Sequence, residues 1–390
     1  MLLENSCYPG DIRVLREALS LVQFGYQVTV IAPRGKGEAY YEWDQGIRIY
    51  RYPGPKEAES GLGYLWEYGA SLFWTFWLTA WVFVRHGFDA IHSHSPPDLY
   101  VLIAICYWPL GKKFVFDHHD ISPEMYVARF QGKGNPWVVR ALTFFEGLSC
   151  RLAKHVITVN ESYKALVLER HHIAESKITV VRNGPSFDRL YLVDPDPEIV
   201  ARGQTVLGYV GVMGFQDGID SLIRALHKLK IELGRSDFYC ILIGKGSSLD
   251  YLKQLTRELE LEDNVLFTGF VSHQDLLKYL STTDICIAPD PYNPFNDRST
   301  MIKVMEYMAL AKPIVAYRLI EHQVTAQDAA LYADVSDELD FARKILQLMD
   351  DPKLRKAMGD SGRKRAEDVL AWTHQEQNLR RAYEQVLGKS

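Results

Sequence analysis

Short runs of β-branched and other apolar residues alternate with longer amphipathic stretches along this chain. The short runs have the length of buried strands, and the longer stretches repeat apolar residues at the spacing of a helix. Strands that alternate with helices are typical of parallel sheets joined by crossover helices. In the first half we expect strands at 27–32, 90–93, 113–117, 155–159 and 178–181, with helices at 11–24, 65–85, 98–107, 135–152 and 162–171 between them.

The alternation stops at 182–203, which contains three prolines, several other turn-forming residues and few periodic apolar positions. This composition is typical of a connecting segment. A chain of 390 residues is also long for one compact core. We therefore predict a first domain at 1–187, a linker at 188–204 and a second domain at 205–372.

A second α/β pattern follows the linker. The segment 351–390 has a helical pattern throughout, and its last part, 373–390, could pack back onto the first domain. Because strands and helices alternate in both halves, we predict two Rossmann-like domains. The strands of the second half are expected at 206–210, 239–243, 265–268, 285–288 and 314–316.

The charge balance of the chain argues against one class of partner. Lys and Arg total 44 against 49 Asp and Glu, which gives a net charge of −5. Nucleic-acid binders usually carry the opposite sign, so we expect no nucleic-acid partner. The first residues lack the pattern of a signal peptide, and the cysteines are too scattered for a zinc site or a disulfide framework. These features predict a cytoplasmic protein without a metal centre, whose cysteines are Cys7, Cys106, Cys150, Cys240 and Cys286.

One stretch of the first half, 69–84, is uncharged and holds three Trp and three Phe. A spanning helix needs about 20 apolar residues, so this stretch is too short to cross a membrane. Its position between two expected strands favours a helix of the core. The other interpretation is an aromatic face that rests on the inner face of a membrane or on a lipid-linked acceptor.

Three expected strands of the second half end in turns that contain glycine. Ligands of open α/β sheets bind at the carboxyl ends of strands, where glycine lets the backbone pass close to a phosphate. The first turn, 211–218, has neither the P-loop nor the dinucleotide-binding spacing, and a plain tight turn is its alternative. For the third turn, the alternative is a loop packed for stability. The candidates for contact with a nucleotide are Gly211, Val212 and Gly214, then Gly244 and Lys245, then Phe270 and Val271.

The segment 296–309 combines a helix start with charged residues just beyond it. Ser299 or Thr300 is expected to cap this helix, whose first amides could then bind an anion such as a diphosphate. Lys303 and Glu306 are three residues apart and so share a helix face. The lysine could neutralise phosphate charge, and the carboxylate could accept hydrogen bonds from a ribose. A surface ion pair between these two residues is the alternative.

This segment resembles the donor-binding motif of the family 4 retaining glycosyltransferases, in the variant Ser-Thr-x-x-Lys-x-x-Glu-Tyr-Met-Ala followed by Lys-Pro-Ile-Val. The similarity extends over nearly the whole chain. Besides the glycine turns, it includes 8–14 and 25–30 near the start, 117–120 in the middle, Asn183-Gly184 at the linker, and Trp372.

The resemblance implies the α/β fold called GT-B, in which two Rossmann-like domains face each other across a cleft. It implies that a nucleoside-diphosphate sugar binds mainly to the second domain and that the acceptor binds to the first. Glu306 would hold the ribose, and Lys303 would offset phosphate charge. The diphosphate or the sugar would lie against the backbone of Ser299, Thr300, Met301 and Ile302.

The resemblance also assigns roles to residues of the first domain. His119 would reach the transferred sugar. The first loop would approach the acceptor or the diphosphate, through Pro9, Gly10, Asp11 and Arg13.

The chain departs from the family pattern where many members carry charged residues. Positions that often hold Arg and Lys at the glycine turn are Val212 and Asp217 here, and Arg298 replaces the first acidic residue of the usual glutamate pair. We expect Arg298 and Lys303 to take over charge neutralisation.

The resemblance implies a retaining glycosyltransferase that moves a hexose to a glycan or lipid-linked acceptor, in surface polysaccharide or glycolipid synthesis. We expect UDP-sugar rather than GDP-sugar as the donor, and no required cofactor. The alternatives are a sugar-nucleotide epimerase or phosphorylase of the same fold, and a non-catalytic partner that binds a nucleotide sugar.

Overall fold

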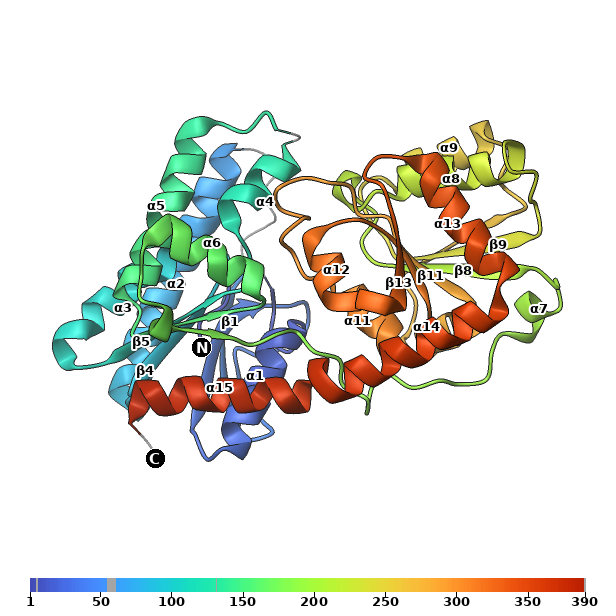
Figure 1. Cartoon of the computed structure of the whole chain (residues 1–390). Helices are drawn as coiled ribbons and strands as arrows, with labels where there is room; N and C mark the ends of the chain where they lie inside the picture. The colour runs from blue at the N-terminus through green and yellow to red at the C-terminus, as the bar shows by residue number, and fades with distance from the viewer. Residues whose placement is uncertain (5, 55–60, 131, 389–390) are drawn as a thin grey trace. The chain divides into compact units, whose positions relative to one another are not determined.

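The computed structural model of the chain describes residues 1–4, 6–54, 61–130 and 132–388 (Figure 1). They form two compact units. The first comprises Met1–Asn183 with Gln375–Ser390, and the second comprises Gly184–His374. The segment 188–204, predicted as a linker, lies in the second unit, where its Leu190 and Ile199 are buried in the core.

The sheet of the first unit is parallel apart from one hairpin. Leu2 forms bridges to Ile31 and Ser93 and so connects β1 with β4. Strands β2 and β3 pair antiparallel, whereas the other pairs run parallel. Across the sheet the order is β2 (Tyr41–Asp44), β3 (Ile47–Pro53), β1 (Val28–Arg34), β4 (Ala90–His94), β5 (Lys113–His118), β6 (His155–Thr158) and β7 (Ile178–Val180).

The hairpin of β2 and β3 is missing from the sequence-based prediction. Its turn residues, Gln45 and Gly46, have φ angles of 47° and 83°, which is the conformation of a tight turn between antiparallel strands. Strand β2 is exposed along most of its length. It therefore lacks the apolar pattern of a buried strand, whereas β3 buries alternate residues and was not predicted either.

Helices pack against this sheet. Helix α1 (Ile12–Gln23) begins at Asp11, whose side chain accepts a hydrogen bond from the amide of Val14, and it buries Val14, Ala18 and Leu21. Further helices contribute to a core cluster around Phe114 and Phe116 of β5. The helical segments between α1 and β7 are α2 (Gly61–His86), η1 (Asp98–Tyr100), α3 (Val101–Tyr107), η2 (Trp108–Leu110), α4 (Ser122–Arg129), α5 (Pro136–Leu152), α6 (Glu161–His171) and η3 (Glu175–Lys177).

The sheet of the second unit is parallel throughout. Its strand order is that of a doubly wound fold, with the order reversing between β8 and β11. The sequence-based prediction lacks only β13, a short strand that contains two alanines. In order across the sheet the strands are β10 (Val265–Gly269), β9 (Phe238–Ile243), β8 (Thr205–Val210), β11 (Ile285–Ala288), β12 (Ile314–Tyr317) and β13 (Ala330–Ala333).

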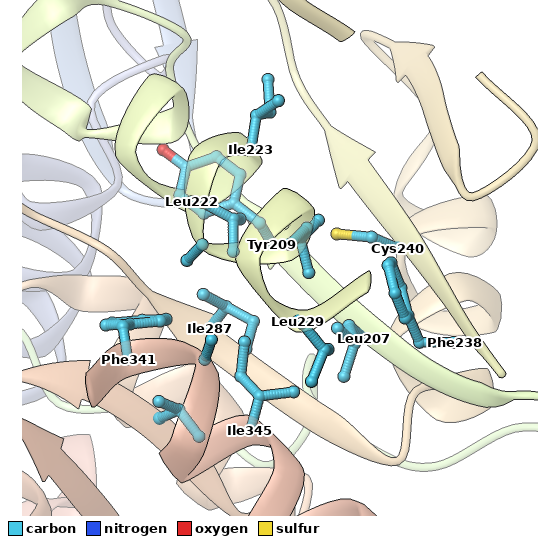
Figure 2. Packing of buried hydrophobic residues seen from close by; sticks show 14 of the residues in the cluster. Leu207, Tyr209, Leu222, Ile223, Leu229, Phe238, Cys240, Ile287, Phe341 and Ile345 are labelled. Atoms are coloured by element: carbon cyan, nitrogen blue, oxygen red, sulfur yellow. The ribbon is translucent and has the colours of Figure 1, made fainter. Parts of the chain in front are cut away.

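Alternate residues of these strands enter two separate cores. Figure 2 shows one core, in which Leu207 and Tyr209 of β8 lie with Leu222 of α8 (Ile219–Ile231) and Phe341 of α13 (Glu338–Asp350). The neighbouring residue Val206 belongs to the opposite core, with Met305 of α11 (Ile302–Ala309). This alternation is expected of a strand covered on both faces. The other helical segments of the unit before residue 352 are α7 (Pro197–Val200), η4 (Phe215–Asp217), α9 (Leu249–Glu258), α10 (His273–Thr282), α12 (Ile320–Ala326) and η5 (Gln327–Ala329).

The end of the chain is helical but not continuous, which corrects the prediction for 351–390. Helix α14 (Pro352–Arg365) runs into a π-helical segment (Ala366–Leu370), and Ala371 leaves the helical conformation with ψ 144°. Helix α15 (Trp372–Leu387) follows. At the break, the amide of Trp372 donates to the carbonyl of Pro185.

From Gln375 onward, α15 belongs to the first unit. The Tyr383 hydroxyl lies 2.8 Å from Nδ1 of His92, and the Tyr383 ring packs against Tyr26. Among the residues that the structure describes, no helix combines the length and the apolarity required to cross a membrane. The cysteines carry free thiols.

Candidate active site

Three loops at the carboxyl edge of the second sheet are joined by backbone hydrogen bonds. The amide of Gly211 donates to the carbonyl of Ile243, and the amide of Gly244 donates to the carbonyl of Gly269. A Cβ on Gly244 would lie 1.9 Å from the Gly211 carbonyl oxygen, and one on Gly246 would lie 2.3 Å from that of Met213. These glycines are therefore needed for the loops to pack on one another, whatever ligand they bind.

The residues predicted to contact the nucleotide differ in exposure at this edge. Val212 is 59% exposed and Phe270 is 81% exposed, although both are apolar. Lys245, in the second of the three loops, is also exposed. Val271 is half-buried and packs against the core. Val212, Lys245 and Phe270 therefore present side chains that a base or a sugar could contact.

Helix α11 begins later than the sequence predicts. Met301 occupies the N-cap position, so the expectation that Ser299 or Thr300 caps the helix is wrong. The hydroxyl of Ser299 donates to the Phe295 carbonyl over 2.7 Å, and that of Thr300 donates to the Glu321 carboxylate over 3.0 Å. These bonds hold the loop before α11. Ile302, at the first turn, is 48% exposed, so the tip of the helix reaches the surface of the unit.

Lys303 is held by a carboxylate that the sequence-based prediction does not contain. Its ammonium lies 2.7 Å from Oδ1 of Asp290, a buried residue two positions after β11, and 4.7 Å from the centre of the Tyr209 ring. Burial would raise the pKa of Asp290, but the charge of Lys303 lowers it to about 2. Oδ2 of Asp290 lies 3.5 Å from Nε2 of His322. Asp290 and Lys303 therefore form a buried ion pair beside the switch point between β8 and β11.

Three more charged residues belong to the loops and the helix that surround this ion pair. Glu306 is half-buried one turn after Lys303 on α11, and Arg298 is half-buried in the preceding loop. Asp217 occupies a position that often holds a basic residue in the family that the sequence resembles. Its carboxylate accepts a hydrogen bond from the amide of Gly214. Burial raises the pKa of Asp217 to about 6. The positive charge of Lys303 lowers this pKa, and the negative charge of Asp290 raises it. A proton on Asp217 would lower its repulsion of a bound anion.

In the first unit, Arg13 is buried and connects three segments through hydrogen bonds. Its guanidinium contacts both carboxylate oxygens of Asp117 over 2.7 Å, and it donates to the carbonyl of Val181 and the side chain of Asn183. These contacts fix α1 to the carboxyl ends of β5 and β7. The neighbouring loop residues Pro9 and Gly10 are exposed, and Asp11 is half-buried as the cap of α1.

His119 follows directly after β5 and is nearly buried. Its Nδ1 lies 3.3 Å from Oδ2 of Asp117, and its backbone amide donates to the hydroxyl of Ser95. Burial would lower the pKa of His119, but the Asp117 carboxylate raises it to about 9. The imidazole is therefore protonated at neutral pH and can donate a hydrogen bond.

Glu17, His92, His94 and Asp117 form a buried cluster whose ligand atoms lie within 4.8 Å of one another. Such a group could hold a metal ion, but Arg13 lies against it, 3.1 Å from Glu17 and 2.7 Å from Asp117. The guanidinium thus already supplies a cation to these carboxylates. Burial raises the pKa of Glu17, and the charge of Arg13 opposes the rise.

A cavity of about 760 Å³ in the first unit lies elsewhere. Its lining includes residues at the amino ends of β1 and β4, such as Val28 and Ala90, with Tyr383 of α15. His119 follows the carboxyl end of β5. Because β4 and β5 run parallel, the cavity and His119 are at opposite ends of the sheet. The cavity is therefore separate from the candidate site.

Comparison with known proteins assigns the chain to a family. Its fold is similar to that of sucrose-phosphate synthase from Thermosynechococcus elongatus, with a TM-score of 0.79 and 20% identity over 98% of this chain and 94% of the other. Residues 12–189 match the family model described as Glycosyltransferase Family 4, and residues 195–365 match that described as Glycosyl transferases group 1. The chain belongs to the GT-B glycosyltransferases.

The glycosyltransferase also resembles Anabaena HepE in complex with UDP-glucose, with a TM-score of 0.69 and 16% identity over 98% of each chain. It is 23% identical to the 2-deoxystreptamine glucosyltransferase of Streptomyces kanamyceticus over 97% of this chain and 99% of that protein. The matches to two other relatives span about half of each chain. These are the uncharacterized glycosyltransferase MJ1607 of Methanocaldococcus jannaschii (29% identical, 47% of this chain and 49% of the relative) and the lipopolysaccharide core biosynthesis glycosyltransferase LpsD of Rhizobium meliloti (28%, 48% and 50%).

The predicted site residues of the glycosyltransferase separate by unit. The donor-side candidates lie in the second unit, and His119 with the first-loop residues lies in the first. The prediction omits Asp290, which follows a buried strand as ligand-binding residues of α/β sheets often do. It also omits His94, although the His-Ser-His pattern at the end of β4 is visible in the sequence. Asp290 lies just beyond the end of a buried strand, and His94 is the last residue of one.

Proposed function

We propose that this glycosyltransferase is a retaining enzyme that transfers a hexose from a nucleoside-diphosphate sugar to a glycan or lipid-linked acceptor. We favour a UDP-sugar over a GDP-sugar, a choice supported by the UDP-glucose complex of HepE and by the glucosyltransferase name of the Streptomyces relative. The name of LpsD supports a role in surface polysaccharide or glycolipid synthesis. We place the reaction in the cytoplasm, next to the inner face of a membrane.

The observation that carries this proposal is the charged face of α11 beside the switch point. A diphosphate brings several negative charges, and helix N-termini bind such groups through their free amides. Lys303, fixed by Asp290, would supply a cation at that position. Glu306, one turn further, would accept hydrogen bonds from the ribose hydroxyls. Exposed Val212 and Phe270 would contact the base or the sugar.

In the proposed reaction, the bond between the anomeric carbon and a diphosphate oxygen breaks. The acceptor oxygen forms its bond on the same face of the anomeric carbon, which retains the configuration, and its proton passes to the departing diphosphate. The protein then has to position two substrates and stabilise an anion. Lys303 would offset the charge of the leaving group, and protonated His119 would donate a hydrogen bond to the transferred sugar. We infer that no metal ion is needed for these steps.

The experiment that tests this proposal incubates the purified protein with a panel of nucleotide sugars, with and without oligosaccharide and lipid-linked acceptors. Mass spectrometry follows nucleoside diphosphate and glycosylated acceptor, and NMR assigns the anomer. We expect release of nucleoside diphosphate that depends on an acceptor. We also expect a product in which the anomeric carbon retains the configuration that it has in the donor. Epimerised donor without an acceptor would indicate an epimerase, and binding without turnover would indicate a non-catalytic partner. Either result would contradict the proposal.

A further inference from the structure

Helix α2 turns its polar residues inward and its aromatic residues outward. The helix buries Ser71, Thr75 and Thr79 at helical spacing. Ser71 donates to Glu4, Thr75 lies 3.2 Å from the Tyr100 hydroxyl, and Thr79 donates to the carbonyl of Thr75. A surface helix of a water-soluble protein normally shows the reverse arrangement. The polar contacts of α2 are thus satisfied inside the unit.

The outward face of α2 is aromatic over most of its length. Its exposed residues recur at the spacing of one helix face, and several rings pack edge to face, with centroids of Phe73 and Trp74 5.5 Å apart and those of Phe76 and Trp77 5.7 Å apart. Contiguous exposed apolar patches of this kind mark interaction surfaces. We call this set the aromatic face: Trp66 (75% exposed), Phe73 (55%), Trp74 (41%), Phe76 (37%), Trp77 (56%), Trp81 (56%) and Val84 (85%).

A second apolar segment continues from the end of α2. The ring of Phe83 lies 5.3 Å from that of Tyr107, the last residue of α3. The residues after Tyr107 include Trp108, which is 66% exposed, and Leu110, which is 55% exposed. The η2 turn, with its exposed apolar residues, therefore follows a helix that packs against the end of α2.

Basic residues gather where these two segments meet. Arg85 is exposed in the last turn of α2, and Lys113 is exposed at the start of β5. Lys112 lies over the Phe83 ring at 5.6 Å, and its ammonium is 3.9 Å from the exposed Asp89. Within 66–84 the sequence holds one charged residue, Glu67. A Trp-rich face with basic residues at its end matches the interface of an anionic bilayer, where indole rings lie among headgroups.

We propose that the aromatic face of α2 docks on the surface of an anionic bilayer, with the helix lying in the interfacial plane. The side of α2 that carries Ser71, Thr75 and Thr79 is buried against the unit, so the helix would contact lipid only along its opposite side. This inference deepens the proposed function by explaining how a soluble donor and a membrane-bound acceptor could meet, and it rests on that function only for the acceptor. The docking itself rests on α2 and η2.

Vesicle co-sedimentation of the full chain tests the docking. The vesicles contain phosphatidylcholine alone or a mixture of phosphatidylcholine and phosphatidylglycerol. The variants are Trp77→Gln and Trp81→Gln, singly and together, and the matched control is Trp43→Gln on β2, because Trp43 is 55% exposed and both α2 residues are 56% exposed. We expect the wild type and the control to sediment with the mixed vesicles and to dissociate at high salt. The double variant should partition into the mixed vesicles at least roughly tenfold more weakly than the wild type, because it loses two large apolar side chains.

Three results would overturn the docking proposal. The wild type could stay in the supernatant with both vesicle types, the control could lose binding as much as the double variant, or sedimentation velocity could reveal a dimer that the α2 substitutions dissociate. The last result would make the aromatic face a contact between two copies. UDP binding by calorimetry, which the α2 variants should retain, reports separately on the proposed donor site. A failure of that site would therefore be distinguished from a failure of docking.

Discussion

The Lys303 ammonium lies 2.7 Å from Oδ1 of Asp290, and both side chains are almost removed from solvent. Breaking a buried ion pair leaves one charge without a partner, which costs more free energy than the pair contributes. Asp290 therefore fixes a cation next to the loops of the switch point. In the proposed reaction that cation faces a departing diphosphate.

Substitution of this pair should separate stability from activity. Lys303→Met leaves Asp290 charged and buried, so we expect a loss of about 3–5 kcal/mol in the free energy of unfolding. The double variant Asp290→Asn with Lys303→Met removes both charges and should recover most of that stability. Its kcat/KM for the donor should nonetheless stay about a hundredfold or more below the wild type, because the stabilising charge is gone. Denaturant unfolding and steady-state kinetics measure the two effects. Turnover equal to the wild type in the double variant would exclude a role for Lys303 in the reaction.

The proton on His119 should appear in the pH dependence of stability. Its pKa in the folded protein is about 9, above the ordinary value of 6.5, because Asp117 favours the charged form despite burial. The stabilisation is complete below pH 6.5 and is lost as the pH rises through about 9. His119→Gln should therefore be less stable than the wild type by roughly 1–3 kcal/mol at pH 6, and the difference should vanish above pH 9.

The buried Glu17 contributes to the same pH dependence. Burial raises the pKa of Glu17, and the charge of His119 opposes that rise, so His119→Gln also raises the pKa of Glu17 further. Denaturant unfolding of both proteins across this pH range therefore measures the contribution of His119 together with its effect on Glu17. A stability difference that does not change with pH would contradict the assigned protonation.

Metal removal gives a further test. If Lys303, the α11 amides and His119 carry the charge stabilisation, activity should be unchanged after dialysis against EDTA. Turnover is compared in EDTA and after addition of Mg²⁺ or Mn²⁺. A loss in EDTA that either ion restores would show that the charge balance at the donor site is incomplete without a metal.

Much of the fold follows from apolar periodicity, because buried strands and amphipathic helices carry strong local signals. The exceptions have local causes. Strand β2 is largely exposed and has no apolar alternation. The hydroxyls of Ser299 and Thr300 donate hydrogen bonds to Phe295 and Glu321, so neither residue caps α11. Sequence spacing suggested that Lys303 pairs with Glu306 or a phosphate. Its observed partner, Asp290, comes from another element, and such long-range pairing is set by sheet topology rather than by local sequence.

The aromatic stretch 69–84 admits two interpretations from its sequence alone. A run of Trp, Phe, Thr and Ser does not reveal which residues face the core. The structure gives the inward direction to Ser71, Thr75 and Thr79, because polar partners for them lie inside the unit. The contacts of Glu4 and Tyr100 with α2 could not be read from periodicity.

If Glu306 holds the ribose of a nucleoside diphosphate on the second unit, the affinity for UDP should depend on its carboxylate, and calorimetric titration with UDP measures that dependence. The proteins compared are the wild type, Glu306→Gln, and the control Glu262→Gln, which changes an exposed glutamate of the same unit. Hydrogen bonds to a charged group contribute about 1.5–3 kcal/mol, so we predict UDP binding that is roughly ten- to a hundredfold weaker in Glu306→Gln and unchanged in the control. Equal UDP affinity in all three proteins, or no UDP binding by the wild type, would contradict the account.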